Sequence, residues 1–336
     1  GGTNRREHGI QLIFPKESEI PGFPLEDSRD RRFMSMPAYL GGRFHLAGEK
    51  FYGSNGRNVR KGLPRSILMA TLNDVETGAP LAYMSANLLS SMRTGAMPGL
   101  ATKLLAREDS KVLTMLGAGP IAKACFRAIM TNAKKIDTVK IKAGSLKSKT
   151  AAALKEFIET HYKQVKEVII CETLEEAVRG SDIISESVSV KPGQYPTYKK
   201  EWLKPGVTLI ATSFFNMDKK ELVGIRKVVD NWKMYEEYGI EDEEGYDENG
   251  MRKATGCMGE EFYYMVEDGL ITRDSIDHLG EIIRGKKPGR KSDDEIIFVA
   301  IEGMPIEDVA WGSEIYRNAV DHGIGTQLKI WDHSSR

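Results

Sequence analysis

The chain is 336 residues long, which is enough for two domains with separate hydrophobic cores. Its 48 lysine and arginine residues balance 48 aspartate and glutamate residues. The sequence therefore lacks the overall field that attracts nucleic acid or an anionic membrane. No apolar run approaches the roughly 20 residues that a membrane-spanning helix needs.

Cysteine and histidine are used sparingly. The three cysteines, Cys125, Cys171 and Cys257, are odd in number and far apart, which is typical of a reducing compartment. Because the chain also shows no signal-peptide pattern, we expect a cytoplasmic protein. The six histidines form no H-x-x-x-H pair and there is no C-x-x-C, so we expect no metal site.

The amino-terminal part of the chain is rich in β-type runs. One of them, Ser66–Leu72, is followed by a turn over Asn73–Gly78. A helix is predicted next, over Ser85–Ala106. It leads into a segment with a different pattern.

From Leu113 onward, short apolar strands alternate with helices. The predicted strands are Leu113–Leu116, Thr138–Lys142, Glu167–Cys171, Ile183–Ser187, Val207–Ala211 and Lys227–Asp230. The predicted helices are Ile121–Asn132, Ser148–Tyr162 and Leu174–Val178. This alternation with short loops indicates a parallel, doubly wound sheet.

An acidic segment, Glu236–Glu248, has eight carboxylates and no base, and we interpret it as a solvated surface insertion. Near the carboxyl end, a β run over Ile296–Ile301 precedes a helix from about Ile306 to His322. The two ends of the chain thus share a β-rich pattern that differs from the middle.

We predict an α/β fold in which a Rossmann-type, doubly wound parallel sheet is inserted into a smaller α+β domain for substrate binding and dimerisation. The predicted boundaries are residues 107–296 for the dinucleotide-binding domain, and 1–106 with 297–336 for the smaller domain. The smaller domain would expose a sheet edge, which a second copy of the chain would cover, so we expect a homodimer.

The strongest motif is the segment Lys111–Met130, which predicts an apolar strand, a glycine turn and a helix. Gly117 and Gly119, followed by Pro120 and Ile121, would put backbone N–H groups and a helix N-terminus against a dinucleotide pyrophosphate. Thr94, and Ser187 at the end of a predicted strand, are further candidate cofactor-binding residues.

The loop after the second strand of this motif bears on the choice of cofactor. An acidic residue there would accept the adenosine ribose hydroxyl of NAD. No carboxylate occurs between Asp137 and Glu156, whereas Ser145, Lys147 and Lys149 offer donors and positive charge. We therefore predict NADP(H) in preference to NAD(H).

Three cations of the amino-terminal part stand out: Lys50 in GEKFYGSN, Arg65 in KGLPRS and Arg93 in SSMRTGA. Each lies among small or glycine-rich neighbours. A guanidinium in such surroundings is suited to bidentate binding of a carboxylate. We predict that Arg93 and Arg65 bind a carboxylate-bearing substrate and that Lys50 lies beside it. There Lys50 would act in catalysis, by biasing the developing charge or by shuttling a proton.

Five stretches of the sequence are similar to the motifs of a known family: MPAYLGG at Met36–Gly42, GEKFYG around Lys50, Gly62–Ala96, LGAGPIA at Leu116–Ala122, and Gly280–Ala310. In them the chain resembles the ornithine cyclodeaminase/mu-crystallin family from about Arg32 onward. Within that family it is most similar to a bacterial subgroup that carries a tyramine oxidase label, and more distantly to staphyloferrin-type amino-acid synthesis dehydrogenases.

The resemblance implies roles for single residues. It makes Arg93 the ligand of the substrate carboxylate and places Lys50 and Arg65 on the substrate side. The family's acid/base is an aspartate after a strand that ends the nucleotide half, and it maps onto Asp218, with Phe215 or Asn216 as alternative aligned positions. Such a carboxylate would exchange a proton with the substrate nitrogen if burial favours its neutral form.

The chain departs from the family in two places. Ala300-Ile301-Glu302 stands where relatives carry a polar pair beside the nicotinamide amide, and the segment before Asp27 is shorter than the usual helical one.

We predict an NAD(P)H-dependent oxidoreductase acting on the amine or imine carbon of a carboxylate-bearing substrate. One alternative is a cyclodeaminase that recycles its cofactor, and another is a non-catalytic mu-crystallin-like binding protein.

Overall fold

The computed structural model describes residues 9–26, 31–188, 195–241, 245–246, 252–253 and 257–330. They divide into two compact units. Unit 1 contains Gly9–Ser90 and the chain from Met304 onward, and unit 2 contains Ser91–Gly303. Each unit is described by itself.

Unit 1 is built on an antiparallel sheet whose five strands follow one another in chain order. The strands are β1 (Ile10–Ile13), β2 (Arg32–Leu40), β3 (Leu46–Ser54), β4 (Ser66–Asp74) and β5 (Pro80–Ser85), with a 3-10 turn, Gly56–Lys61, between β3 and β4. The predicted turn after β4 is present, and its Asp74 carboxylate accepts a hydrogen bond from the Thr77 N–H at 2.8 Å.

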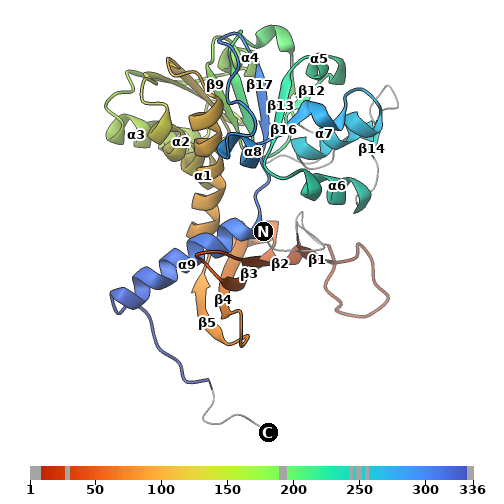
Figure 1. Ribbon diagram of the computed structural model, residues 1–336, viewed down its shortest axis with the longest axis vertical. Helices are drawn as coiled ribbons and strands as arrows, with labels where there is room; N and C mark the ends of the chain where they lie inside the picture. Colours follow the sequence, from red (N-terminus) through yellow and green to blue (C-terminus); the bar gives the residue numbers. More distant parts are fainter. Residues whose placement is uncertain are drawn as a thin grey trace. The chain divides into compact units, whose positions relative to one another are not determined.

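Helix α9 (Pro305–Asp321) covers one face of this sheet and packs on β2, β3 and β4 (Figure 1). Alternate side chains of the strands point to this face. Leu72 and Val309 are buried there. The opposite face keeps large apolar side chains exposed, among them Phe33, Phe51 and Ile67.

Unit 2 is built on an eight-stranded sheet in the order β16-β13-β17-β11-β9-β6-β7-β8, with every neighbouring pair parallel. Its strands are β6 (Val112–Leu116), β7 (Thr138–Lys142), β8 (Glu167–Ile170), β9 (Ile183–Glu186), β11 (Thr208–Ala211), β13 (Arg226–Val229), β16 (Ile276–His278) and β17 (Ile297–Ala300). Strands buried on both faces explain the continuous apolar runs in the sequence.

Helices cover both faces of this sheet (Figure 1). One face carries α1 (Asn87–Leu105), α2 (Pro120–Asn132), α3 (Lys149–His161) and α8 (Leu279–Ile283), and the other α4 (Leu174–Val178), α5 (Lys219–Val223), α6 (Trp232–Glu241) and α7 (Met258–Glu267). The remaining short elements are β10 (Thr197–Tyr198), Lys200–Trp202, β12 (Asn216–Met217), β14 (Gly245–Tyr246), β15 (Arg252–Lys253) and Arg273–Ser275.

The predicted fold class is confirmed: a doubly wound parallel sheet is inserted between the two chain segments of a smaller antiparallel unit. The units divide after Ser90 and after Gly303, whereas the predicted boundaries lie at 106/107 and 296/297. The difference has a simple cause, since α1 lies against α2 at Gly95 and Gly99, and β17 pairs with β11 and β13. Of the acidic segment, residues 242–244 and 247–248 lie outside the described residues.

Candidate functional site

The predicted glycine turn connects β6 to α2. Gly117 has φ +98°, and a Cβ atom at this position would lie 2.8 Å from the Ser187 carbonyl oxygen. Only glycine fits both conditions. Gly119 is the N-cap of α2 with open space around it, and Pro120 fills the first helical position, where an N–H is not needed.

This turn fits a pyrophosphate. The N-cap residue, Gly119, has no side chain with which to cap α2, and the helix dipole at this N-terminus favours an anion. Ile121 is partly exposed in the first turn of the helix, while Ala122 is buried against the sheet. The arrangement is the one by which a strand–turn–helix unit holds the phosphates of a dinucleotide.

Helix α1 brings two more predicted residues to unit 2. A Cβ atom on Gly95 would overlap the Ala124 backbone, and one on Gly99 would lie 2.7 Å from the Ala128 Cβ. The two contacts advance in the same direction along α1 and α2. Residues just before Gly95 therefore lie toward the N-terminus of α2, and these are Thr94 and Arg93, whose side chain is buried.

The loop after β7 is polar and basic, as predicted. Ser145 and Lys147 are exposed, and Ser148 caps α3 by accepting a hydrogen bond from the Ala151 N–H at 3.3 Å. The cap fixes the loop backbone and leaves the two preceding side chains in solvent. They can therefore supply a donor and a positive charge to a phosphate group.

The end of β9 carries a carboxyl group that the sequence analysis missed. Glu186 pairs in register with Leu116, next to the glycine turn, and with Ala211 at the end of β11. Its side chain is only 1% exposed. Oε1 accepts a hydrogen bond from the Val188 N–H at 2.7 Å, and burial raises the pKa to about 8. The signal for it was a glutamate at the end of an apolar strand.

Two polar atoms beside the glycine turn are buried without a hydrogen-bond partner among the described residues: Glu186 Oε2 and Ser187 Oγ. Native proteins leave few such atoms unsatisfied. Together with the Gly117 turn, they are polar groups that a bound dinucleotide can satisfy. The residues present thus fit the nicotinamide cofactor predicted from the sequence.

Ala300-Ile301-Glu302, which differ from the family's polar pair, end β17 and begin the segment after it, and hydrogen bonds hold that segment. Asp230, at the end of β13, accepts hydrogen bonds from the Glu302 and Gly303 N–H groups at 3.0 Å each. It also accepts one from the Tyr235 hydroxyl at 2.7 Å. Burial raises the pKa of Asp230. The carboxylate thereby holds the chain as it leaves the sheet.

Unit 1 contains a buried ion pair on the α9 side of its sheet. Lys50, in the middle of β3, is 2% exposed, and its Nζ lies 2.8 Å from Asp308 Oδ2 of α9. The Ser90 Oγ is 3.5 Å from the same Nζ. Lys50 was predicted as a site residue, whereas Asp308 was not. The segment GMPIEDVA contained it, but nothing local distinguishes Asp308 from Glu307.

Arg65 directly precedes β4. It is exposed, and its carbonyl oxygen accepts a hydrogen bond from the Asn55 N–H at 2.9 Å. The β3–β4 register pairs Lys50 with Ala70, five residues after Arg65. At about 3.3 Å per residue, the two backbone positions are roughly 16 Å apart. Arg65 and Lys50 thus belong to the same unit, but their backbone positions are not adjacent.

Asp218 does not have the surroundings that its predicted role requires. Its side chain is exposed and accepts a hydrogen bond from the Lys220 N–H at 2.7 Å, as the N-cap of α5. The two alternative positions, Phe215 and Asn216, also make contacts within the fold. Phe215 is buried and stacks on Tyr198, and the Asn216 amide donates to Thr197 Oγ1 at 2.7 Å. The burial expected around this carboxylate is therefore absent.

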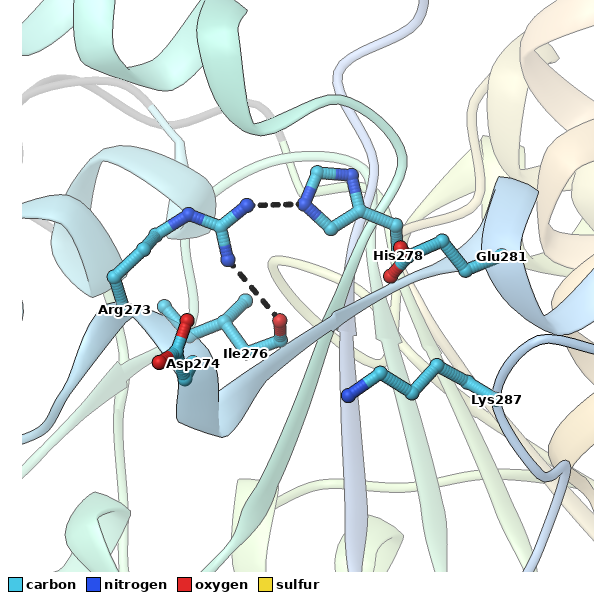
Figure 2. A pocket seen from close by; sticks show the side chains of 6 residues that line it. All are labelled: Arg273, Asp274, Ile276, His278, Glu281 and Lys287. Atoms are coloured by element: carbon cyan, nitrogen blue, oxygen red, sulfur yellow. Dashed lines mark hydrogen bonds between the residues drawn. The ribbon is translucent and has the colours of Figure 1, made fainter.

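A pocket of about 320 Å³ opens at the edge strand β16. It is lined by Arg273, Asp274, Ile276, His278, Glu281 and Lys287 (Figure 2). The Arg273 guanidinium donates hydrogen bonds to His278 and to the Ile276 carbonyl oxygen, so the two side chains brace one another. None of the predicted site residues lines this pocket, and four strands separate β16 from β6.

Two kinds of feature are absent from the described residues. They contain no group of three side chains able to hold a metal ion. Nor does any helix among them have both the length and the apolar character needed to cross a membrane.

Comparison with known proteins gives a consistent picture. A model of the ornithine cyclodeaminase/mu-crystallin family matches residues 2–323. Alanine dehydrogenase of Archaeoglobus fulgidus is 32% identical over 98% of this chain and 93% of its own length.

Two solved structures are similar in fold. Delta(1)-pyrroline-2-carboxylate reductase of Thermococcus litoralis, in complex with NADH and L-proline, has a TM-score of 0.72 and 27% identity, covering 90% of this chain and 87% of that one. An archaeal alanine dehydrogenase dimer with bound NAD has a TM-score of 0.73 and 27% identity, covering 96% and 89%.

Proposed function

Because the chain belongs to the ornithine cyclodeaminase/mu-crystallin family, we propose that it is a nicotinamide-dependent oxidoreductase acting on the amine or imine carbon of a small amino or imino acid. The observation that carries this proposal is the Gly117 turn, which is packed on the Ser187 carbonyl and leads into the N-terminus of α2, where the N-cap residue is a glycine. The named dehydrogenase and reductase relatives support the same class of reaction.

The cofactor supplies the hydride chemistry, and the protein supplies binding and orientation. We assign the pyrophosphate to Gly117, Gly119 and the first turn of α2, with Thr94, Pro120, Ile121 and Ser187 beside it. Holding the reactants in a fixed orientation makes hydride transfer nearly unimolecular. Burial of the Arg93 side chain keeps a positive charge in unit 2 where water is scarce.

Arg93 is assigned to the substrate carboxylate. A buried guanidinium binds a carboxylate through two parallel hydrogen bonds, and the interaction strengthens as water is excluded. Arg65 is exposed, so we assign it a secondary part in attracting an anionic substrate.

Proton transfer at the substrate nitrogen is assigned to Lys50 together with Asp308. Their 2.8 Å contact lets a proton pass between ammonium and carboxylate without a bridging group. Both groups are almost fully buried, whereas Asp218 is a solvent-exposed helix cap. Of the two aspartates, Asp308 therefore has the setting that acid–base catalysis requires.

We further propose that NADP(H) is preferred to NAD(H), on the basis of Ser145 and Lys147. Titration of the protein with NADPH and with NADH, followed by nicotinamide fluorescence, gives the two dissociation constants. Tighter binding of NADPH is expected. A matched variant, Lys147→Glu, should reverse the order, because a carboxylate repels the 2′-phosphate. Tighter binding of NADH by the unaltered chain would overturn the preference.

We propose that the chain forms a homodimer through the exposed face of the unit 1 sheet. Leu12, Phe33 and Ile67 lie on one face in register, and Phe33 stacks on Phe51 at 5.9 Å between ring centroids. All four side chains are at least 42% exposed. An apolar patch of this kind marks an interaction surface. The cytoplasm is the proposed location, since all three cysteines are free and buried.

One screen tests the reaction. NADPH absorbance is followed while keto acids are offered with ammonia or small amines, and cyclic imino acids are offered alone. Net oxidation of NADPH supports the proposed oxidoreductase. Release of ammonia from ornithine without net change in absorbance would instead identify a cyclodeaminase. Binding of a ligand with neither reaction would identify a binding protein and contradict the proposal.

A further inference from the structure

We propose that Glu186 discriminates between the two redox states of the cofactor, keeping its proton when the reduced, uncharged nicotinamide ring is bound and releasing it when the oxidised, positively charged ring is bound. This inference rests on the proposed function, because it requires a nicotinamide dinucleotide at the Gly117 turn.

The position of Glu186 in the sheet carries the first step. In a doubly wound sheet the ligand lies across the carboxyl ends of the strands, and its adenosine ribose is held at the end of the second strand, here β7. Since β7 and β9 flank β6 on opposite sides, the nicotinamide half extends over the β9 side. Glu186 is the last residue of β9.

The backbone around Glu186 is tied to the cofactor turn. Its carbonyl oxygen accepts a hydrogen bond from the Thr212 N–H at 2.9 Å, and the next N–H, of Ser187, donates to the Leu116 carbonyl at 2.9 Å. The Ser187 carbonyl in turn lies against Gly117. A charge on Glu186 is therefore held in a fixed place relative to the turn.

The carboxyl group itself is built for two states. Oε1 is engaged by the Val188 N–H, while Oε2 is buried with no hydrogen-bond partner among the described residues. Among the described residues, three titratable groups interact electrostatically with Glu186. Glu302 affects the pKa of Glu186, and Glu186 affects the pKa values of Tyr198 and Cys125. None of the three is a cation.

Burial leaves the three neighbours unable to neutralise a carboxylate. It raises the pKa of Tyr198 well above its ordinary value and that of Cys125 to about 12, so both stay neutral near pH 7. Glu302 raises the pKa of Glu186 further. A positively charged ring would be a counter-ion that the described residues do not offer to Glu186.

The size of the effect follows from the charge. In the folded chain without cofactor, the pKa of Glu186 is about 8. An opposite charge within about 4–6 Å lowers the pKa of a carboxyl group by about 1–3 units. At pH 7.5 the oxidised and reduced complexes should then differ by roughly half a proton per site. The carboxyl O–H bond breaks, the proton passes to the buffer and the electron pair stays on Glu186.

Isothermal titration calorimetry measures this proton directly. The protein is titrated with NADP+ and with NADPH, and in parallel with NAD+ and NADH, at pH 7.5 in phosphate and in Tris, whose ionisation enthalpies differ. The dependence of the binding enthalpy on buffer gives the protons exchanged. We expect about half a proton more to be released with the oxidised form than with the reduced form.

Two variants separate this role from a structural one. Glu186→Gln keeps an acceptor for the Val188 N–H but cannot ionise, so the difference between oxidised and reduced forms should vanish while both still bind. Asp182→Asn is the matched control. The buried Asp182 carboxylate lies at the amino end of β9, whereas Glu186 lies at the carboxyl end. It accepts hydrogen bonds from the Lys111 and Val112 N–H groups at 2.8 and 2.9 Å. The Asp182→Asn variant should leave the proton difference between the oxidised and reduced forms unchanged.

The outcomes are distinguishable. An equal number of protons for both redox forms in the unaltered chain, or an undiminished difference in Glu186→Gln, would overturn the role of Glu186 and leave the proposed function intact. Failure of all four dinucleotides to bind would overturn both. Should Glu186→Gln fail to fold, a pH series on the unaltered chain still decides. The proton difference must be largest between the lowered pKa of the oxidised complex and the pKa of about 8, and must vanish well above and well below both values.

Discussion

At the scale of single residues, the buried pair Lys50–Asp308 sets the chemistry available to unit 1. Taking two charges out of water is unfavourable, and their mutual attraction offsets this only when the geometry is good. Here the 2.8 Å contact joins residues 258 positions apart in the sequence. A pair of this kind is weak evidence for stability, which favours a functional reason for its presence.

Substitution of Asp308 tests that reason. Asp308→Asn leaves Lys50 buried without its counter-charge, so we expect the free energy of unfolding to fall by about 3–5 kcal/mol. We also expect turnover to fall by about two orders of magnitude or more, as loss of a general acid–base does. Urea denaturation and NADPH absorbance measure the two effects.

A double variant separates stability from catalysis. Lys50→Met with Asp308→Leu replaces the pair by apolar side chains and should recover much of the stability but none of the activity. Asp218→Asn is the matched control, because asparagine is an equally good helix N-cap and should leave both quantities nearly unchanged. Normal turnover in Asp308→Asn together with loss of turnover in Asp218→Asn would return the acid–base role to Asp218.

At the scale of elements, the turn between β6 and α2 combines a left-handed backbone with a close contact. Its Gly117 has φ +98° and faces the Ser187 carbonyl. Gly117→Ala places a Cβ atom 2.8 Å from that oxygen in a backbone conformation that alanine avoids. We expect NADPH affinity to fall at least tenfold, because the turn must move away from β9.

Gly280→Ala is a suitable comparison, since that glycine has open space around it and lies in α8, away from the residues assigned to the cofactor. It should bind NADPH within about twofold of the unaltered chain, as surface substitutions have small effects. Fluorescence titration of both variants measures the difference. Equal affinities would show that the Gly117 turn does not hold the cofactor.

The end of β9 gives stability a defined pH dependence. Glu186 has a pKa near 4.5 when exposed and about 8 when buried in the folded chain. Between these values the folded state binds more protons than the unfolded state, so the free energy of unfolding falls as pH rises. Burial raises the pKa of Asp230 too, so it contributes in the same direction.

Urea unfolding at pH 5.5 and 7.5 measures this dependence, below the pH of about 8 at which the buried Lys227 begins to contribute strongly. We expect the unaltered chain to lose more stability over this range than Glu186→Gln, in which the remaining decrease reports Asp230 and other groups. Identical losses in the two proteins would mean that Glu186 keeps an ordinary pKa in the folded state.

At the scale of the whole molecule, the apolar face of the unit 1 sheet predicts self-association. Phe51→Lys puts a charge in the middle of that face, beside Phe33, and should convert the dimer into a monomer. Val223→Lys is the control, because Val223 is equally exposed, at 43%, but lies on α5 of unit 2. Light scattering measures the mass. A monomeric unaltered chain would refute the proposal.

Much of this architecture could be predicted from local patterns. The strands β6 and β7, the helix α2 and the glycine turn were predicted within a residue or two, because each depends on neighbours in the sequence. The likeness to the subgroup with a tyramine oxidase label stays a prediction. The role predicted for Asp218 depends on its place in the chain, which does not tell whether its carboxylate is buried, and in the folded chain it is an exposed helix cap.

By itself, the sequence determined that a parallel sheet of the nucleotide-binding type interrupts the sequence of a smaller β-rich unit, since hydrophobic periodicity and glycine positions are local properties. Only the tertiary structure decided which charges are buried and with what partner. Asp308 meets Lys50 because α9 folds back on β3, and Glu186 loses water because helices cover both faces of its strand. Desolvation and long-range contact are properties of the packed chain, and these govern the chemistry of both groups.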